Sequence, residues 1–337
     1  MIRFLQSPAA AWRGYASCVA LGLGAALSIG SAHGATAWKP EKAIQFIAPN
    51  AAGGGADRIL RIMVNVLQER GQTDATISVV NKPGGGGAVA YNYLNLHPGN
   101  GHLVALGSRA LLTNNLVGQG PSYTELTPVA KLFDEYISVT VRPDSPIKNG
   151  KELIERLRKD PAALSVGIAT SLGGPNHQGL AAVLKAAGVD IRKMRTVIFP
   201  SGGAATTAML GGHIDVVPIT AAFAASMLRQ GQIRMLAVGS PTRLTGVLAE
   251  VPNWREQGFD VVVSNWRAMF GAKGLSEAQI AYWEEALRRL IDSDEWKKEL
   301  EANFWTTSFL RGSETRKFLG HDQTETRAFL IELGLAK

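Results

Sequence analysis

The feature that most constrains the fold is a short apolar run followed at once by three glycines and an amphipathic helical pattern. Residues 44–48, Ile-Gln-Phe-Ile-Ala, predict a buried strand, and Pro49 ends it because proline cannot donate to a sheet ladder. Gly53–Gly55 let the backbone turn sharply and approach a ligand closely. We expect Asp57 to cap a helix whose apolar residues recur at helical spacing as far as Leu67. The first turn of such a helix presents unpaired N–H groups, which suit an anion.

The same order of strand, glycine-rich loop and helix returns along the chain. This alternation predicts an α/β fold with parallel strands. Ligands of open α/β sheets bind outside the carboxyl ends of the strands, so these loops can converge on one crevice. A tight turn without a ligand is the alternative at each loop. Later strands are expected over residues 76–80, 102–108, 164–169 and 196–199. Glycine loops follow three of them, over 83–87, 171–177 and 200–204, and Ser108-Arg109 follows the strand over 102–108.

Other segments also have regular patterns. Ser276 and Gln279 form a capping box, which predicts the start of a helix. Three more helices are expected over residues 88–96, 150–159 and 313–333, and four more strands over residues 137–141, 214–219, 233–238 and 260–264.

Several functional classes lack support in the residues. No lysine follows Gly53–Gly55, and Arg58 stands where a dinucleotide fingerprint needs its third glycine. No G-x-S-x-G elbow surrounds Ser171, and the histidines are scattered singly, so we expect no catalytic residue, metal or cofactor. No basic stretch interleaved with aromatic residues indicates nucleic-acid binding. An α/β enzyme that uses the glycine loops to bind a phosphate or nucleotide remains the alternative function.

The N-terminal 37 residues have the layout of a secretory signal peptide. Arg3 and Arg13 precede an apolar run, and small residues follow, ending in Ala35-Thr36-Ala37. The run is short for a membrane anchor, which is the alternative. We therefore expect an exported protein with cleavage near Ala37. The single cysteine, Cys18, lies in this segment, so the mature chain would contain neither disulfides nor thiolate ligands.

Taken together, the motifs resemble those of the tripartite tricarboxylate transporter receptors, the Bug or TctC type of periplasmic solute-binding protein. The first is Pro49-x-x-x-Gly53-Gly54-x-x-Asp57-x-x-x-Arg61, and the resemblance covers essentially everything after residue 37. The later motifs, in order, are Asn81-Lys82-Pro83-Gly84-Gly85-Gly86-Gly87, His177 after a glycine loop, Gly202-Gly203-Ala204, Leu210-Gly211-Gly212-His213-Ile214-Asp215, Ile233-Arg234-Met235-Leu236-Ala237-Val238 and Val251-Pro252-x-x-x-Glu256-x-Gly258.

This resemblance implies the type II periplasmic-binding-protein fold, with two α/β domains and a ligand cleft between them. Residues 38–141 and 262–337 would form one domain and 142–261 the other, with crossings near 137–142 and 260–266. It also implies a monomeric, non-enzymatic receptor, for transport or sensing. Such a receptor would capture a small organic carboxylate and deliver it to the membrane permease subunits of a tripartite tricarboxylate-type transporter.

The glycine loops and their neighbours supply the expected binding site. We expect backbone N–H groups of residues 50–57 to hold most of the carboxylate charge. The residues expected to line the cleft are Asn50, Ala52, Gly53, Gly54, Ala56, Asp57, Gly85, Gly86, Ser108, Arg109, Ser171, Gly173, His177, Ser201, Gly202, Ala204 and Asp215.

Three of these side chains have an alternative structural interpretation. For Asp57 a helix cap is preferred to a ligand contact. For His177 a capping or packing role and a place in the cleft are equally expected. Arg109 could pair with a carboxylate bidentately or lie on the surface after the third strand. The sequence also departs from the family pattern at Asn50 and at Pro200-Ser201, so the ligand of any one member is not transferred.

Overall fold

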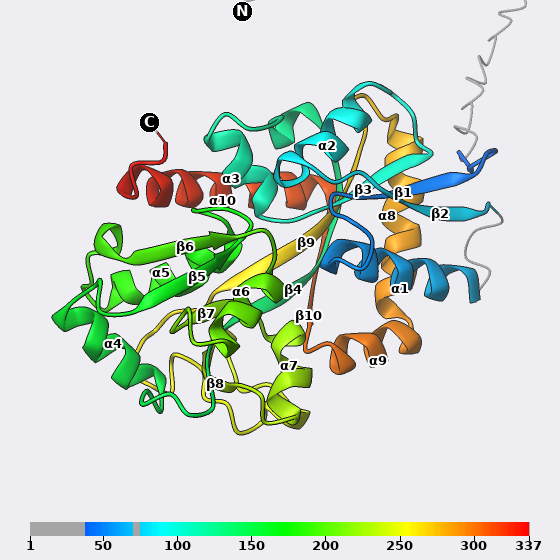
Figure 1. The fold of residues 1–337 in the computed structure, drawn as a ribbon. Coiled ribbons are helices and arrows are strands. Elements are labelled where there is room, and N and C mark those ends of the chain that lie inside the picture. The colour runs from blue at the N-terminus through cyan, green and yellow to red at the C-terminus, as the bar shows by residue number, and fades with distance from the viewer. Residues whose placement is uncertain (1–37, 70–74, 337) are drawn as a thin grey trace, which may run out of the picture. The chain divides into compact units, whose positions relative to one another are not determined.

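The computed structural model describes residues 38–69 and 75–336 (Figure 1). The expected signal peptide therefore lies outside the described residues. The chain starts with β1 (Ile44–Ala48), α1 (Gly55–Glu69), β2 (Ile77–Asn81), α2 (Ala88–Asn95) and β3 (Leu103–Gly107). Strand β1 pairs in parallel with both β2 and β3, as the alternating pattern predicts.

A fifteen-residue strand, β4 (Thr127–Val141), is the centre of the fold. Residues as far as Tyr136 pair antiparallel with β9 (Ser264–Gly271), and the strand's other edge pairs with β10 (Thr306–Arg311). From Ile137 onward the partners are β7 (Val217–Thr220) and β8 (Arg234–Val238). One strand thus belongs to two groups of strands, and its partners change between adjacent residues.

The elements fall into two lobes, each built around its own strands. The first lobe contains the sheet β2-β1-β3-β9-β4-β10. The second contains β5 (Ser165–Ala169), β6 (Arg195–Phe199), β7, β8 and the end of β4, with β5 and β6 paired in parallel. Its helices are α4 (Gly150–Lys159), α5 (Pro175–Ala186), α6 (Gly202–Leu210) and α7 (Ala221–Arg229).

Helices cover both faces of the first lobe's sheet. One face packs on α1, α8 (Glu277–Asp292) and α9 (Asp294–Ala302), around buried Phe46, Trp283 and Trp296. The other packs on α2, α3 (Ala110–Leu116) and α10 (Gly312–Glu332). The Ser276 hydroxyl accepts the Gln279 N–H at 3.2 Å, which confirms the predicted capping box.

Three of the expected strands are wrong in extent, and the one expected over residues 214–219 begins only at Val217, in β7. The expected strand over 137–141 is only the last third of β4, and no strand covers 260–263, because β9 begins at Ser264. In residues 261–263, Val263 donates its N–H to the Gly239 carbonyl at 2.8 Å, outside any ladder. Sequence patterns also missed α3, α7, α9 and β10.

The last helix joins the two lobes. Near its start, α10 contributes Leu319 to the first lobe's core. Near its end, Phe329 and Leu333 pack against the second lobe's core, which includes Leu180 and Trp254. The chain from residue 37 onward consequently forms one compact unit rather than two separate ones.

Candidate functional site

The glycine loop between β1 and α1 is held by the buried carboxylate of Asp57, which is 2% exposed. It accepts hydrogen bonds from the Gly53 N–H (2.9 Å), from Asn81 Nδ2 (3.0 Å) and from Arg61 Nε (3.0 Å). Helix α1 already begins at Gly55, so Asp57 fastens the preceding loop instead of capping the helix as expected. The hydrogen bond from Arg61, assisted by those from Gly53 and Asn81, holds the pKa of Asp57 below its ordinary value.

The same loop leaves backbone donors unused. Asn50 Oδ1 accepts the Asp57 N–H at 3.2 Å, and the Ala51 carbonyl accepts the Gly54 N–H at 3.1 Å. Within the described residues, the N–H groups of Gly55 and Ala56 have no acceptor, as expected for a first helical turn. These two groups, with the positive end of the helix dipole, form a site that favours an anion.

The second glycine loop lies against the first. Asn81 Nδ2 donates to the Asn50 carbonyl at 3.1 Å, and a Cβ atom on Gly87 would lie 3.1 Å from Pro49 Cβ. Asn114 on α3 donates to the carbonyls of Gly85 (3.3 Å) and Gly86 (2.7 Å). Gly86 has φ +61°, and a Cβ there would lie 2.3 Å from Asn114 Nδ2. The close approach of Asn114 therefore requires glycine at this position.

Helix α3 connects these loops to the second lobe. The Thr113 hydroxyl donates to the Gly173 carbonyl at 3.4 Å, and Gln178 Nε2 donates to the Thr113 hydroxyl at 3.2 Å. Thr113 and Asn114 are adjacent residues that contact loops from different lobes. Sequence patterns did not reveal this short helix, whose Thr113 and Asn114 side chains contact residues distant in sequence.

His177 supports the third loop. It is 1% exposed, and its Nδ1 accepts the Gly173 N–H at 2.9 Å. Burial lowers the pKa of His177 to about 4, so the imidazole is neutral at pH 7. Nδ1 therefore fixes the loop, whereas Nε2 is buried without a hydrogen-bond partner among the described residues, so a role of His177 in the cleft stays a prediction.

Thr170, which the sequence did not single out, precedes Ser171 with φ 67°. Backbone strain of this kind in a non-glycine residue is found most often at functional sites. Its N–H donates to the Phe199 carbonyl at 2.8 Å and so ties the third loop to the fourth. In the fourth loop, the Ser201 hydroxyl accepts the Ala204 N–H at 3.1 Å and caps α6, which starts at Gly202.

Arg109 and Asp215 have partners within the fold. The Arg109 guanidinium pairs bidentately with Asp322 on α10, at 2.7 and 3.2 Å, beside buried Ser108. Asp215 Oδ2 accepts hydrogen bonds from the N–H and hydroxyl of Ser165, both at 2.7 Å. Ser165 is the first residue of β5, so Asp215 lies at the opposite end of this strand from Ser171. The structure therefore links the four glycine loops in series and separates Asp215 from them.

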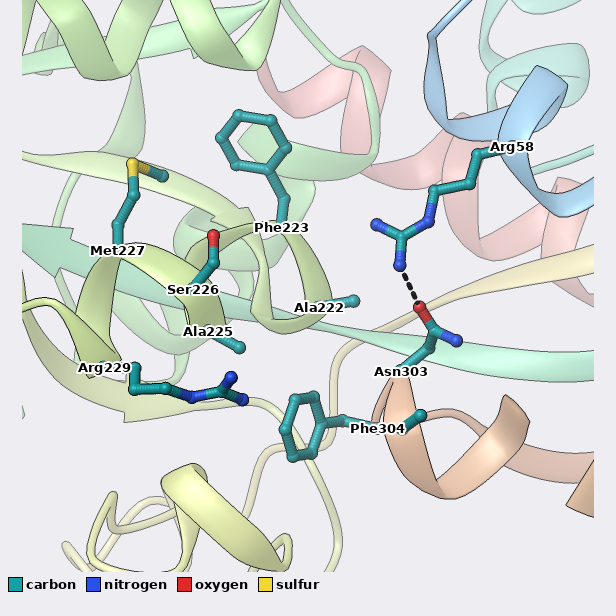
Figure 2. A pocket seen from close by; sticks show the side chains of 10 residues that line it. Arg58, Ala222, Phe223, Ala225, Ser226, Met227, Arg229, Asn303 and Phe304 are labelled. Atoms are coloured by element: carbon teal, nitrogen blue, oxygen red, sulfur yellow. Dashed lines mark hydrogen bonds between the residues drawn. The ribbon is translucent and has the colours of Figure 1, made fainter. Parts of the chain in front are cut away.

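A cavity of ≈ 390 Å³ lies beside the first loop (Figure 2). It is lined by Arg58 of α1, by six residues of α7 between Ala222 and Arg229, and by Ala302–Phe304 at the end of α9. None of the expected site residues lines it. In the described residues no group of three or more His, Cys, Asp or Glu side chains could hold a metal ion, and no helix combines the length and apolar character needed to cross a bilayer.

Comparisons with known proteins agree with this architecture. A UPF0065 protein of Bordetella pertussis is 24% identical over 321 residues, which is 92% of this chain and 94% of the relative. Protein BugT of the same organism is 23% identical over 303 residues, covering 88% and 90%. The structure of R. palustris Rpa4515, solved with adipate, aligns with a TM-score of 0.77 at 20% identity and covers 88% of this chain and 99% of that one.

The structural neighbours are two-domain periplasmic binding proteins, which confirms the expected α/β fold of the type II class. The model of the family described as tripartite tricarboxylate transporter family receptor matches residues 59–335, most of the chain. Receptors of this family are periplasmic solute-binding proteins, which favours a receptor over the alternative enzyme. The chain belongs to the family of tripartite tricarboxylate transporter receptors.

Proposed function

We propose that the protein captures a small organic carboxylate between its two lobes and delivers it to the membrane permease of a tripartite tricarboxylate-type transporter, without catalysing a reaction. Its membership of the receptor family supports this function. The adipate in Rpa4515 shows that a protein of similar fold was solved with a small dicarboxylate.

The observation that carries the proposal is the contact series between the glycine loops. Asn81, Asn114, Thr113 and Thr170 join the four loops, and the free N–H groups of Gly55 and Ala56 lie at the first of them. Preformed backbone donors suit a carboxylate, because no charged side chain has to be desolvated to bind it. The Arg109 guanidinium already binds Asp322, so its charge would be secondary, as expected from the sequence.

We infer the domain division from the sheet partners and the cores. Residues 38–141 with 262–337 would form one domain and 142–261 the other, as the family resemblance implies. The change of partners after Tyr136 and the start of β9 at Ser264 support two crossings close to these limits. Contacts of Phe329 and Leu333 with the second core would make α10 a third connection.

The proposed site can be tested with a valine at Gly55. A Cβ atom there would lie 3.9 Å from Arg267 Nη2 and otherwise enter open space, next to the free N–H groups. Gly54 is less suitable, since its Cβ would lie 2.4 Å from Asn50 Nδ2 and disturb the loop itself. We expect the purified mature protein to show a thermal shift with one or more members of a carboxylate library.

Gly55→Val should abolish that shift. Gly203→Val, at the start of α6 in the other lobe, should abolish it too, because its Cβ has no neighbour within 3.7 Å and the ligand bridges both lobes. Ligand at about a hundred times its Kd stabilises by roughly 2.7 kcal/mol. Retention of the full shift in Gly55→Val would show that the first loop does not hold the carboxylate.

A further inference from the structure

The cavity beside the first loop lies between the two lobes. Arg58 reaches it from the first turn of α1, and Phe223, Ser226 and Met227 reach it from α7 (Figure 2). Asn303 and Phe304, at the corner between α9 and β10, complete the lining on the side of the first lobe. Its volume of ≈ 390 Å³ is within the range of small-molecule sites.

Two of the residues that line the cavity adjoin the proposed carboxylate site. Arg58 follows Gly55 by three residues, so the two lie on the same face of α1. A Cβ atom on Gly203 would lie 3.8 Å from the Phe223 ring. A ligand held at the glycine loops would therefore approach the cavity beside Phe223 and Arg58.

Two cations of the cavity lack an acidic partner among residues 38–69 and 75–336. Arg58 Nη2 donates to Asn303 Oδ1 at 2.7 Å, and Arg229 makes neither a hydrogen bond nor an ion pair with any described residue. None of the ten lining residues is acidic. The nearest carboxylate in the network is Glu299, whose Oε2 accepts from Asn303 Nδ2 at 3.1 Å. Asn303 thus orients Arg58 while its charge remains available for a ligand.

Apart from Ser226, the remaining lining is apolar, and one of its residues is strained. Phe223 is 44% exposed although its side chain is large and hydrophobic. Phe304 has φ 57°, a conformation unfavourable for a bulky residue, and it packs against the second lobe's core, which includes Val251. Such strain persists where surrounding structure fixes it, and it is concentrated at ligand sites. Two aromatic rings and Met227 favour a flat apolar body beside the two guanidinium groups.

We propose that the ligand is an aromatic dicarboxylate, whose second carboxylate binds Arg58 and Arg229 while its ring contacts Phe223. This inference rests on the proposed function, because the first carboxylate occupies the glycine loops. Guanidinium groups pair well with carboxylates, and the apolar part of the lining would accept a ring better than a strongly hydrated chain.

The test compares benzene-1,4-dicarboxylate with 4-methylbenzoate, which replaces one carboxylate by a methyl group. Calorimetric titration of the mature protein should give an affinity about 10- to 100-fold higher for the dicarboxylate than for 4-methylbenzoate. This ratio corresponds to the free energy that charge-assisted hydrogen bonds to one carboxylate contribute. Arg229→Gln and Arg58→Gln should each reduce this ratio about tenfold or more. Arg288→Gln on α8, where the arginine pairs with Asp292 at 2.9 Å, should keep the ratio.

The outcomes separate the two proposals. Equal affinities for the two acids in the wild-type protein, or an unchanged ratio in Arg229→Gln, would overturn the cavity's role and leave the carboxylate receptor standing. Loss of binding of both acids in Gly203→Val, with the ratio lowered only by the arginine variants, would support both. If aliphatic carboxylates produce thermal shifts but neither aromatic acid binds, the aromatic class is wrong; if no carboxylate binds, the proposed function itself fails.

Discussion

Asp57 and His177 have the same structural role in the two lobes. Each is a buried side chain that accepts a hydrogen bond from the N–H of a glycine four residues earlier. Asp57 accepts from Gly53, and His177 accepts from Gly173. Both glycines have φ +77°, so each side chain stabilises a turn that the backbone needs before a helix begins. The loops are thus fixed before any ligand arrives.

Replacing the Asp57 carboxylate should loosen the first loop. Asp57→Asn removes a charged acceptor from three donors, and we expect a loss of about 1.5–3 kcal/mol of unfolding free energy at about pH 7. Because the pKa of Asp57 is lowered in the fold, its stabilisation is present above its ordinary pKa and is lost as the pH falls below that value. Urea unfolding at about pH 7 and about pH 3 should therefore show a smaller difference between variant and wild type at the lower pH. An equal difference in unfolding free energy between variant and wild type at both pH values would contradict this role.

His177 should make stability depend on pH in a different window. Its pKa is lowered from 6.5 to about 4, so the unfolded chain binds more protons between these values. The wild-type protein should lose stability as the pH falls through this range, by about 3 kcal/mol at 1.36 kcal/mol per unit. His177→Gln, which keeps an acceptor for Gly173, should lack this loss in urea titrations made at several pH values. A variant as pH-dependent as the wild type would show that another group is responsible.

At the scale of elements, the sequence patterns predicted the helices and strands whose apolar side chains lie on one face. Helix α4 begins and ends where periodicity placed it, over residues 150–159. Strand β4 was missed over ten residues because it includes Lys131, Asp134 and Glu135, which resemble surface residues. In the fold Lys131 pairs with Asp134, and Glu135 pairs with Arg267 of β9, so these charges are buried in pairs. Such pairing depends on neighbouring strands and leaves no local signal.

Helix α10 offers an element-scale test. Leu330 is fully buried, and a Cβ atom on Gly173 would lie 2.5 Å from its Cδ2, so the helix packs directly on the third loop. Leu330→Ala should cost about 2–5 kcal/mol of unfolding free energy and weaken ligand binding by loosening that loop. The neighbouring Ile331 is 48% exposed, and Ile331→Ala should change stability by only about 0.5 kcal/mol. Similar losses in both variants would contradict the packing of α10 on the loop.

For the whole molecule, the lobes are joined by more than the two chain segments that cross between them, strand β4 and the residues before β9. At the crossing, Gly239 donates its N–H to the Ile137 carbonyl and accepts from the Val263 N–H, both at 2.8 Å. Phe304, Thr113 and the end of α10 add contacts at the sides. The sequence predicted the glycine loops and the type of fold, but these contacts join residues distant in sequence. It could therefore not show which predicted side chains, such as Arg109, already have partners.

Ligand binding should nevertheless bring the lobes closer. A carboxylate that contacts both Gly55 and Gly203 binds the closed arrangement better, and it shifts the population by that difference in affinity. Small-angle scattering at saturation with a carboxylate that gives a thermal shift should show a smaller radius of gyration than without it. The same acid added to Gly203→Val should leave the profile unchanged, since this variant does not bind. Leu330→Ala, which frees one side contact, should have the larger radius without ligand and the larger decrease with it. An unchanged wild-type profile at saturation would mean that the side contacts already hold the lobes closed, and that binding selects no other arrangement.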